Sequence, residues 1–420
     1  MIQTFSLPGG ITLDCFQDSR FKQSCLSLQF ITPMQKNTAA LNALLPAVLL
    51  RGTENAPDLR DITLRLDDLY GASVGSLVRR IGDYQTTGFY CGFISDKYAL
   101  DKDQVFSPMV DFLRELLLQP LLENGVFPVS FVESEKRNLI SAIESQRNDK
   151  RTYASARLLQ LTCKDDSFGI PRTGDIESVS AITPEGLFSH YRSLLKKSPV
   201  RLFYVGDTCP EQVAKMLAPL FSDLDRQVEA LPAQTAFSGG APETHKEEAE
   251  VSQARLSLAY TTPITLRSPS FAAMQVLNVL FGSGMTCKLF TQIRERMSLC
   301  YEIGSVFHSS KGIVEVYAGV DKSNLELVQA ETQKLLDACK QGDFTGEELE
   351  NAKQALLSSL RSTHDSPGSI ERYYATGALS GLNMTPEEYM ENISAVTPKQ
   401  VAAAAETLRL QTVYFLKGAD

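Results

Sequence analysis

Two segments of the chain alternate apolar and polar residues as a half-buried strand does. Residues 23–33 read QSCLSLQFITP, and residues 253–263 read QARLSLAYTTP. Because successive side chains of a strand point to opposite faces of a sheet, each segment is predicted to form a strand with one face on a core. The two segments also match each other position by position, which indicates an internal repeat.

Further landmarks recur in the same order in both halves. Residues 178–187 read SVSAITPEGL and residues 392–401 read NISAVTPKQV. Thr is a favoured N-cap and Pro is favoured at the first helical position, so each Thr-Pro predicts a helix start. A helical pattern precedes each start and a predicted strand follows it: EKRNLISAIESQ (135–146), AKQALLSSLRST (352–363), RLFYVGD (201–207) and TVYFLKGAD (412–420).

Residues 231–250, LPAQTAFSGGAPETHKEEAE, lie between the halves and show little apolar periodicity. This composition is typical of an exposed linker. We therefore predict an N-terminal domain over residues 1–230 and a C-terminal domain over residues 251–420. Each half mixes strands and helices without strict βαβ alternation, which favours the α+β class. The expected fold is two homologous domains in a clam-like arrangement, each a largely antiparallel sheet with helices packed on one face.

Composition narrows the function classes. The chain is 43% hydrophobic and 22% charged, as soluble globular proteins are, and its net charge of −9 argues against nucleic-acid binding. Its eight cysteines are scattered, which predicts reduced and mostly buried thiols. The N-terminus lacks a signal-peptide pattern, and the most apolar stretch, residues 39–50, is too short to span a membrane. We expect a cytoplasmic protein without membrane contact.

Five segments together resemble the insulinase/pitrilysin (inverzincin) peptidases of the two-domain, processing-peptidase type. They are ALLPAVLLRGT (43–53), LDDLYGASVGSL (66–77), FGSGMTCKLF (281–290), RERMSLCY (294–301) and KGIVEVYAG (311–319). The resemblance extends over nearly the full chain. It implies the fold described above, and among bacteria it is greatest to the metal-free member of paired processing-peptidase-like proteins associated with elongation factor P modification.

The zinc motif of that family, H-x-x-E-H, is absent. The resemblance places Ala43 and Ala47 at the two histidine positions, Pro46 at the catalytic glutamate and Ala142 near the third ligand. None of these side chains can bind a metal or move a proton. The four histidines have no partner at ligand spacing, so we expect no metal on this chain. Pro46 predicts that the helix begins later than in the family or is kinked there.

The second half keeps a pair that the resemblance implicates in catalysis. Arg294 and Tyr301 match the R-E-x-x-x-L-x-Y motif, whose guanidinium and phenol groups stabilise an oxyanion or hold substrate. The structural alternative is a surface ion pair for Arg294 and a core position for Tyr301.

A second retained feature is the strand that follows a Gly-Ala step. In the family this is a sheet edge to which substrate adds as an extra strand, so the resemblance makes Gly71, Ala72, Ser73 and Val74 substrate-binding residues. The alternative is an ordinary edge strand opened by a turn glycine.

These features favour a non-catalytic subunit that pairs with a zinc-bearing homologous peptidase. The chain would supply Arg294, Tyr301 and a wall of the chamber for a peptide substrate, while zinc would be held by the partner. We expect no peptidase activity from the chain alone. The alternatives are a stand-alone pseudopeptidase, as a homodimer, and a structural scaffold like the metal-free core subunits of the respiratory cytochrome complex.

Overall fold

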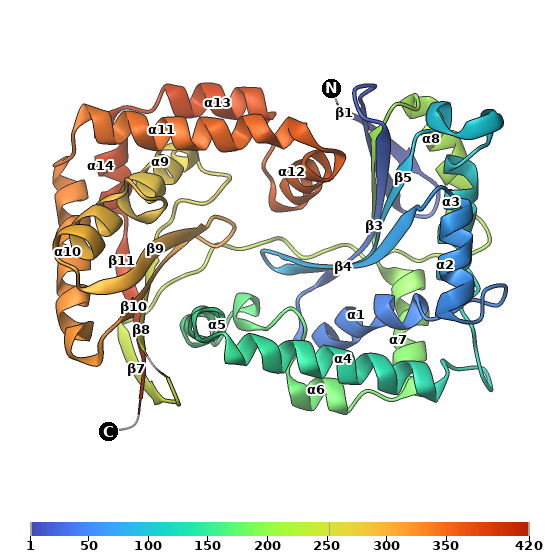
Figure 1. The fold of residues 1–420 in the computed structure, drawn as a ribbon, viewed down its shortest axis with the longest axis horizontal. Helices are drawn as coiled ribbons and strands as arrows, with labels where there is room; N and C mark the ends of the chain where they lie inside the picture. Colours follow the sequence, from blue (N-terminus) through green and yellow to red (C-terminus); the bar gives the residue numbers. More distant parts are fainter. Residues whose placement is uncertain (1, 252, 419–420) are drawn as a thin grey trace. The chain divides into compact units, whose positions relative to one another are not determined.

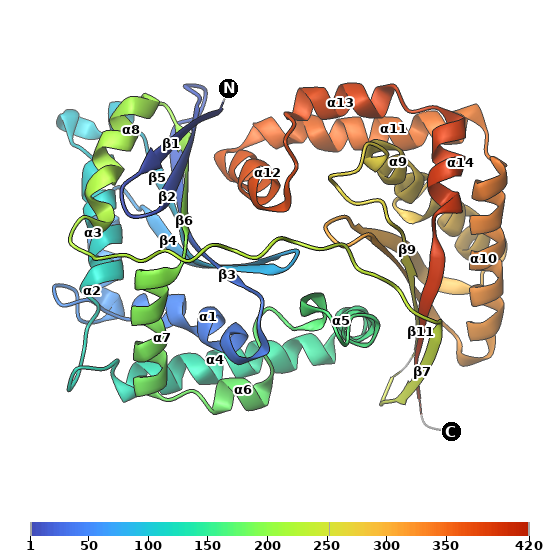
Figure 2. The ribbon, with the colours of Figure 1, turned by 180° about the vertical axis from the view of Figure 1, so that it is seen from behind.

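The computed structural model describes residues 2–251 and 253–418. They form two compact units, each with its own sheet and helices (Figures 1 and 2). The first unit comprises Met1–Ile143, Ile170–Ala233 and His364–Thr376; the second comprises Glu144–Gly169, Gln234–Thr363 and Gly377–Asp420. Each unit thus includes a segment from the opposite half of the chain, which the predicted boundaries at residues 230 and 251 do not anticipate.

The first sheet has six strands, and all neighbours are antiparallel except β2 and β6. This confirms the predicted, largely antiparallel sheet. Leu26, Leu28 and Phe30 of β3 lie in the core, as the alternation of that segment predicts. In sheet order the strands are β1 (Ile2–Leu7), β2 (Ile11–Gln17), β6 (Val200–Gly206), β3 (Gln23–Pro33), β5 (Tyr84–Ile94) and β4 (Ser73–Ile81).

Helices cover the face of this sheet that carries Leu26 and Leu28. Phe106 of α3 stacks on Tyr204 of β6, with 5.1 Å between ring centroids. Helix α7 starts at the predicted Thr-Pro, because the Thr183 hydroxyl accepts a hydrogen bond from the Gly186 N–H. The helices are α1 (Lys36–Leu49), α2 (Leu59–Asp68), α3 (Phe106–Leu118), α4 (Val129–Asn148), α6 (Ile176–Ser180), α7 (Pro184–Lys197) and α8 (Pro210–Leu217).

The opposite face of the first sheet is covered by a segment from the C-terminal half. Residues of α12 (Pro367–Ser380), including the buried Ile370, pack on Cys25 and Phe203. Glu371, also in α12, is fully buried, accepts a hydrogen bond from Ser27 Oγ at 2.8 Å and pairs with Arg79 at 2.8 Å. Strands β3 and β6 therefore carry buried side chains on both faces of the sheet.

The second sheet repeats the first. Cys25, Gly92 and Ser73 lie opposite one another on β3, β5 and β4. Arg255, Gly319 and Glu302 do so on β8, β10 and β9, in the same register as the sequence repeat. The strands, in sheet order, are β7 (Glu243–Glu248), β11 (Arg409–Lys417), β8 (Ala254–Thr261), β10 (Ile313–Val320) and β9 (Cys300–His308).

The helices of the second unit resemble those of the first in their Thr-Pro start and in their packing on the sheet. Helix α14 starts at its predicted Thr-Pro, where Thr397 and Gln400 form a capping box. Helix α5, from the N-terminal half, packs on the strands of this sheet, with Leu158 beside Ala259 and Tyr414 in one core cluster. The helices are α5 (Lys150–Thr162), α9 (Phe271–Gly282), α10 (Leu325–Gln341), α11 (Gly346–Arg361), α13 (Pro386–Ser394) and α14 (Pro398–Glu406).

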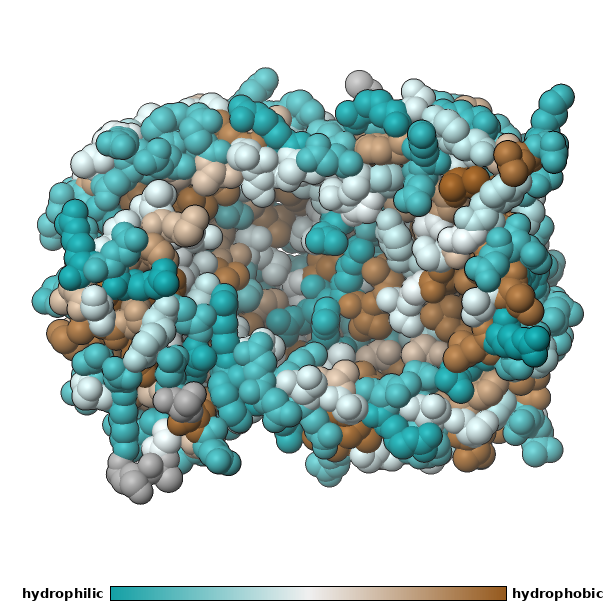
Figure 3. Space-filling model, viewed as in Figure 1, coloured by the Kyte–Doolittle hydropathy of each residue, from teal (hydrophilic) through white to brown (hydrophobic). Residues whose placement is uncertain are grey.

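The segment predicted as a linker, residues 231–250, contains strand β7, which pairs in parallel with β11. By ladder position β7 corresponds to β2 of the first sheet. Its sequence, ETHKEE, is polar throughout and gives no hydrophobic signal, since an edge strand needs little burial. No helix among the described residues is long and apolar enough to cross a membrane, and polar side chains predominate on the face shown in Figure 3.

Candidate functional site

Helix α1 carries the residues that stand at the zinc-motif positions. Ala43 and Pro46 are buried and Ala47 is partly buried, and the helix continues through Pro46 to Leu49. A proline nitrogen cannot donate to the carbonyl four residues earlier, which here belongs to Asn42. The Thr87 hydroxyl donates to that carbonyl instead, at 2.6 Å. The helix therefore neither starts after Pro46 nor stops there, because β5 replaces the missing donor.

A buried polar network lies directly beside the zinc-motif positions on α1. The Asn42 side chain, 0% exposed, contacts His190 Nε2 at 2.8 Å and donates to Gln85 Oε1 at 2.8 Å. Gln85 in turn donates to the Ala39 carbonyl at 3.0 Å. Burial lowers the pKa of His190 to about 4, so the imidazole is neutral at pH 7. The network holds α1 on α7 and β5, and it was not recognised from the sequence because its members are far apart along the chain.

The remaining position of the degenerate zinc motif is exposed. Ala142 lies on the solvent-facing side of α4. Within residues 2–251 and 253–418 no three His, Cys, Asp or Glu side chains are grouped to hold a metal ion. The donor set for zinc is thus missing at the motif, where Ala43 and Ala47 offer only methyl groups. No disulfide joins the eight cysteines in the described part of the chain, and all except Cys209 are buried, as predicted.

The Gly-Ala step precedes an edge strand. Gly71 has a φ of +70° and follows Tyr70 at +62°, so the chain turns through two left-handed residues before β4. Ala72 is buried and its N–H donates to the Leu66 carbonyl at 3.0 Å, which anchors the turn. Strand β4 is the last strand of its sheet and pairs with β5 alone. Its other edge therefore presents backbone N–H and C=O groups that can accept an added strand.

Arg294 lies on a π-helix, Leu289–Arg296, that leads into β9. It is exposed, its guanidinium lies 4.5 Å from the Phe290 ring, and it has no ion pair within the described chain. It is close enough to the buried Cys300 to act on that thiol electrostatically, opposing the burial that raises its pKa to about 11. The structural alternative of a surface ion pair for Arg294 is therefore wrong.

Tyr301 follows a strained turn. Ser298 has a φ of +53°, which is uncommon outside glycine and marks a conformation that its surroundings impose. Tyr301 is 57% exposed near the start of β9, which lies at one edge of the second sheet. The alternative of a core position for this tyrosine is wrong. Both polar side chains of the predicted pair are therefore accessible on the second unit.

The chain is similar to metallopeptidase-like proteins over its whole length. A family model described as the peptidase M16 inactive domain matches residues 181–356. The "Probable inactive metalloprotease YmfF" of Bacillus subtilis (strain 168) is 31% identical over 412 residues, which cover 98% of this chain and 97% of that protein.

Two solved structures have the same fold. A conserved protein from Enterococcus faecalis V583 is 27% identical with a TM-score of 0.92, over 100% of this chain and 99% of that one. A peptidase M16 inactive domain from Pseudomonas fluorescens is 21% identical with a TM-score of 0.81, over 100% and 98% of the two chains.

Proposed function

Since this chain belongs to the peptidase M16 (insulinase) family as an inactive member, we propose that it is the non-catalytic subunit of a zinc metallopeptidase-like heterodimer. The partner is a homologous subunit that carries H-x-x-E-H and the zinc. This chain contributes Arg294 and Tyr301 to the partner's site, together with one wall of the peptide chamber.

The proposal is supported by a difference between the zinc-motif positions on α1 and the arginine–tyrosine pair on the second unit. On α1 the metal-binding and proton-transferring side chains are replaced by two alanines and a proline. On the second unit Arg294 and Tyr301 are exposed; Arg294 contacts the Phe290 ring but has no ion pair within the described residues, and Tyr301 lies outside the core. Loss of function by drift gives no reason to keep an accessible arginine and tyrosine in this arrangement.

The chemistry required of the pair is modest. When water attacks a peptide carbonyl, negative charge develops on the oxygen, and a guanidinium or a phenol O–H can donate a hydrogen bond to it. The partner's zinc would supply the activated water. Strand β4 would hold the peptide backbone through ladder hydrogen bonds, which need no particular side chain and therefore outlast the loss of the metal.

Co-purification with zinc-bearing homologues tests the proposal. A partner should bind in equal amount, and peptide cleavage should occur only in the mixture. Arg294→Ala should then lower turnover by about 10²–10³, as the loss of one oxyanion donor does, without dissociating the complex. Arg296→Ala, an exposed arginine on the same π-helix, is the matched control and should keep full activity.

Two results would overturn the proposal. Full turnover in the Arg294→Ala complex would remove the role of the pair while leaving the heterodimer. Failure of every zinc-bearing homologue to bind would leave the stand-alone pseudopeptidase, which the open edge of β4 favours because strand addition needs no metal.

A further inference from the structure

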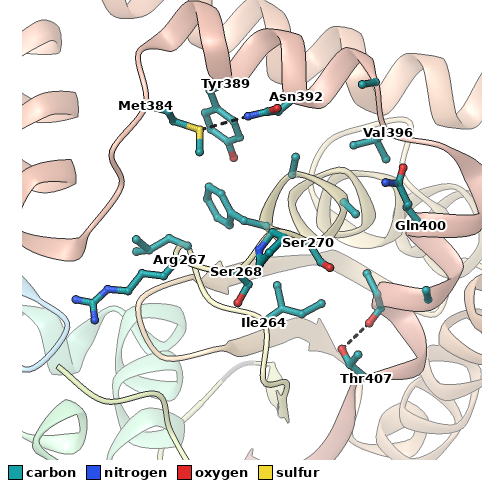
Figure 4. Close-up of a pocket in the computed structure, with 18 of the residues that line it drawn as sticks. Ile264, Arg267, Ser268, Ser270, Met384, Tyr389, Asn392, Val396, Gln400 and Thr407 are labelled. Carbon is teal, nitrogen blue, oxygen red and sulfur yellow. Dashed lines mark hydrogen bonds between the residues drawn. The ribbon is translucent and has the colours of Figure 1, made fainter. Parts of the chain in front are cut away.

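A large open groove lies within the second unit, and none of its lining residues belongs to β9. Its volume is about 1120 Å³. It is bounded by the connection from β8 to α9, the first turn of α9, the residues before α13, and helices α13 and α14 (Figure 4). All of these elements belong to the same compact unit, so the groove is formed within one folded body.

The floor of the groove is apolar and firmly held. Phe271 stacks on Tyr389 with 5.3 Å between the ring centroids, and the two side chains are 5% and 6% exposed. Ile264 and Val396, 7% and 5% exposed, continue this floor. Because these side chains are fixed by core packing, the groove is preformed and a ligand would not have to order it.

The rim of the groove is polar but nearly uncharged. Asn392 offers an exposed carboxamide from α13, and Ser270 offers a hydroxyl from the opposite side (Figure 4). On α14 the amide NH₂ of Gln400 is the group available to a ligand, because its Oε1 already accepts the Thr397 N–H at 2.8 Å in the capping box. A carboxamide both donates and accepts, so it can bond the N–H and C=O groups of a peptide backbone.

Arg267 is the single charged residue of the lining, in a chain whose net charge is −9. Its Nε donates to the Ser380 carbonyl at 3.1 Å, beside Gly381 at one end of the groove. This bond fixes the side chain, and its two Nη groups make no hydrogen bond within the described residues. They are therefore available to a carboxylate.

The groove is lined by a connection that is longer in the second unit than in the first. In the first unit two residues, 34 and 35, separate Pro33 from the start of α1. In the second unit seven residues, 264–270, separate the matching Pro263 from the start of α9, and several of them line the groove.

We propose that this groove binds an extended peptide that carries apolar side chains and places a carboxylate on Arg267. The apolar floor suits alternate side chains of such a peptide, and the carboxamide rim suits its backbone. Arg267 and the lack of acidic lining residues select an anionic segment over a cationic one. This site is separate from the arginine–tyrosine pair and does not depend on the proposed heterodimer.

Fluorescence anisotropy with the full chain tests the site. The probe is a labelled octapeptide that alternates leucine and serine and ends in glutamate with a free C-terminus. The control peptide has the same leucine–serine alternation but ends in a lysine amide. We expect saturable binding of the acidic peptide at least about tenfold tighter than that of the basic one. Ala403 is an exposed lining position on α14. The variant Ala403→Trp should lower the affinity for the acidic peptide at least about tenfold, because the indole fills part of the groove.

Charge reversal separates this groove from unspecific binding. Arg267→Glu should abolish the preference for the acidic peptide, while Arg361→Glu, an exposed position on α11 outside the lining, should preserve it. Ala355→Trp on α11 is the matched steric control and should bind as the wild type does. Unchanged binding in Ala403→Trp, or no saturable binding of the acidic peptide up to millimolar concentration, would overturn the proposal.

Discussion

At the scale of single residues, His190 links stability to pH. Its folded-state pKa of about 4 lies below its ordinary 6.5, so the unfolded chain binds the proton more readily. Stability is therefore complete above pH 6.5 and falls as the pH drops from 6.5 to 4. The lowered pKa corresponds to roughly 3 kcal/mol over this window.

Chemical denaturation at several pH values measures this effect. His190→Gln should flatten the pH dependence between 6.5 and 4, while weakening the contact with Asn42 at pH 7 by about 1 kcal/mol. An identical pH profile in His190→Gln would contradict the assignment to this imidazole.

At the scale of elements, the turn before β4 depends on a left-handed residue. Gly71 has a φ of +70° and open space where a Cβ would be, so a side chain there meets conformational strain but no steric clash. Gly71→Val should destabilise the protein by about 1–2 kcal/mol. Gly71→Asn should cost less, because Asn tolerates this region. Urea unfolding of the two variants measures the difference, and equal losses would point to another cause.

The two Thr-Pro helices show how far local sequence determines an element. Thr183 and Thr397 cap α7 and α14 at the predicted positions, because capping needs only neighbours in the chain. Strand β7 shows the opposite case, since its pairing with β11 creates a strand from a polar segment. The proline in α1 also depends on tertiary structure. The helix continues through Pro46 because the Thr87 hydroxyl donates to the Asn42 carbonyl, and only the fold brings Thr87 there.

At the scale of the whole molecule, each unit contains a helical segment from the other half of the chain. Without residues 364–376 the first unit would expose Cys25, Phe203 and Val205, and Arg79 would lose the buried carboxylate of Glu371. We therefore predict that residues 1–233 do not fold alone but do so when co-expressed with residues 234–420. A cooperative unfolding transition in the isolated first fragment would contradict this.

The sequence by itself determined the α+β class, the internal repeat and the loss of the zinc motif. These follow from periodicity, capping residues and side-chain chemistry, which are local properties. Only the tertiary structure decided which segments cover each sheet, that His190 is held beside the altered motif, and that Arg294 and Tyr301 are exposed. These properties depend on contacts between residues far apart in the chain, and on burial, which a single sequence does not encode position by position.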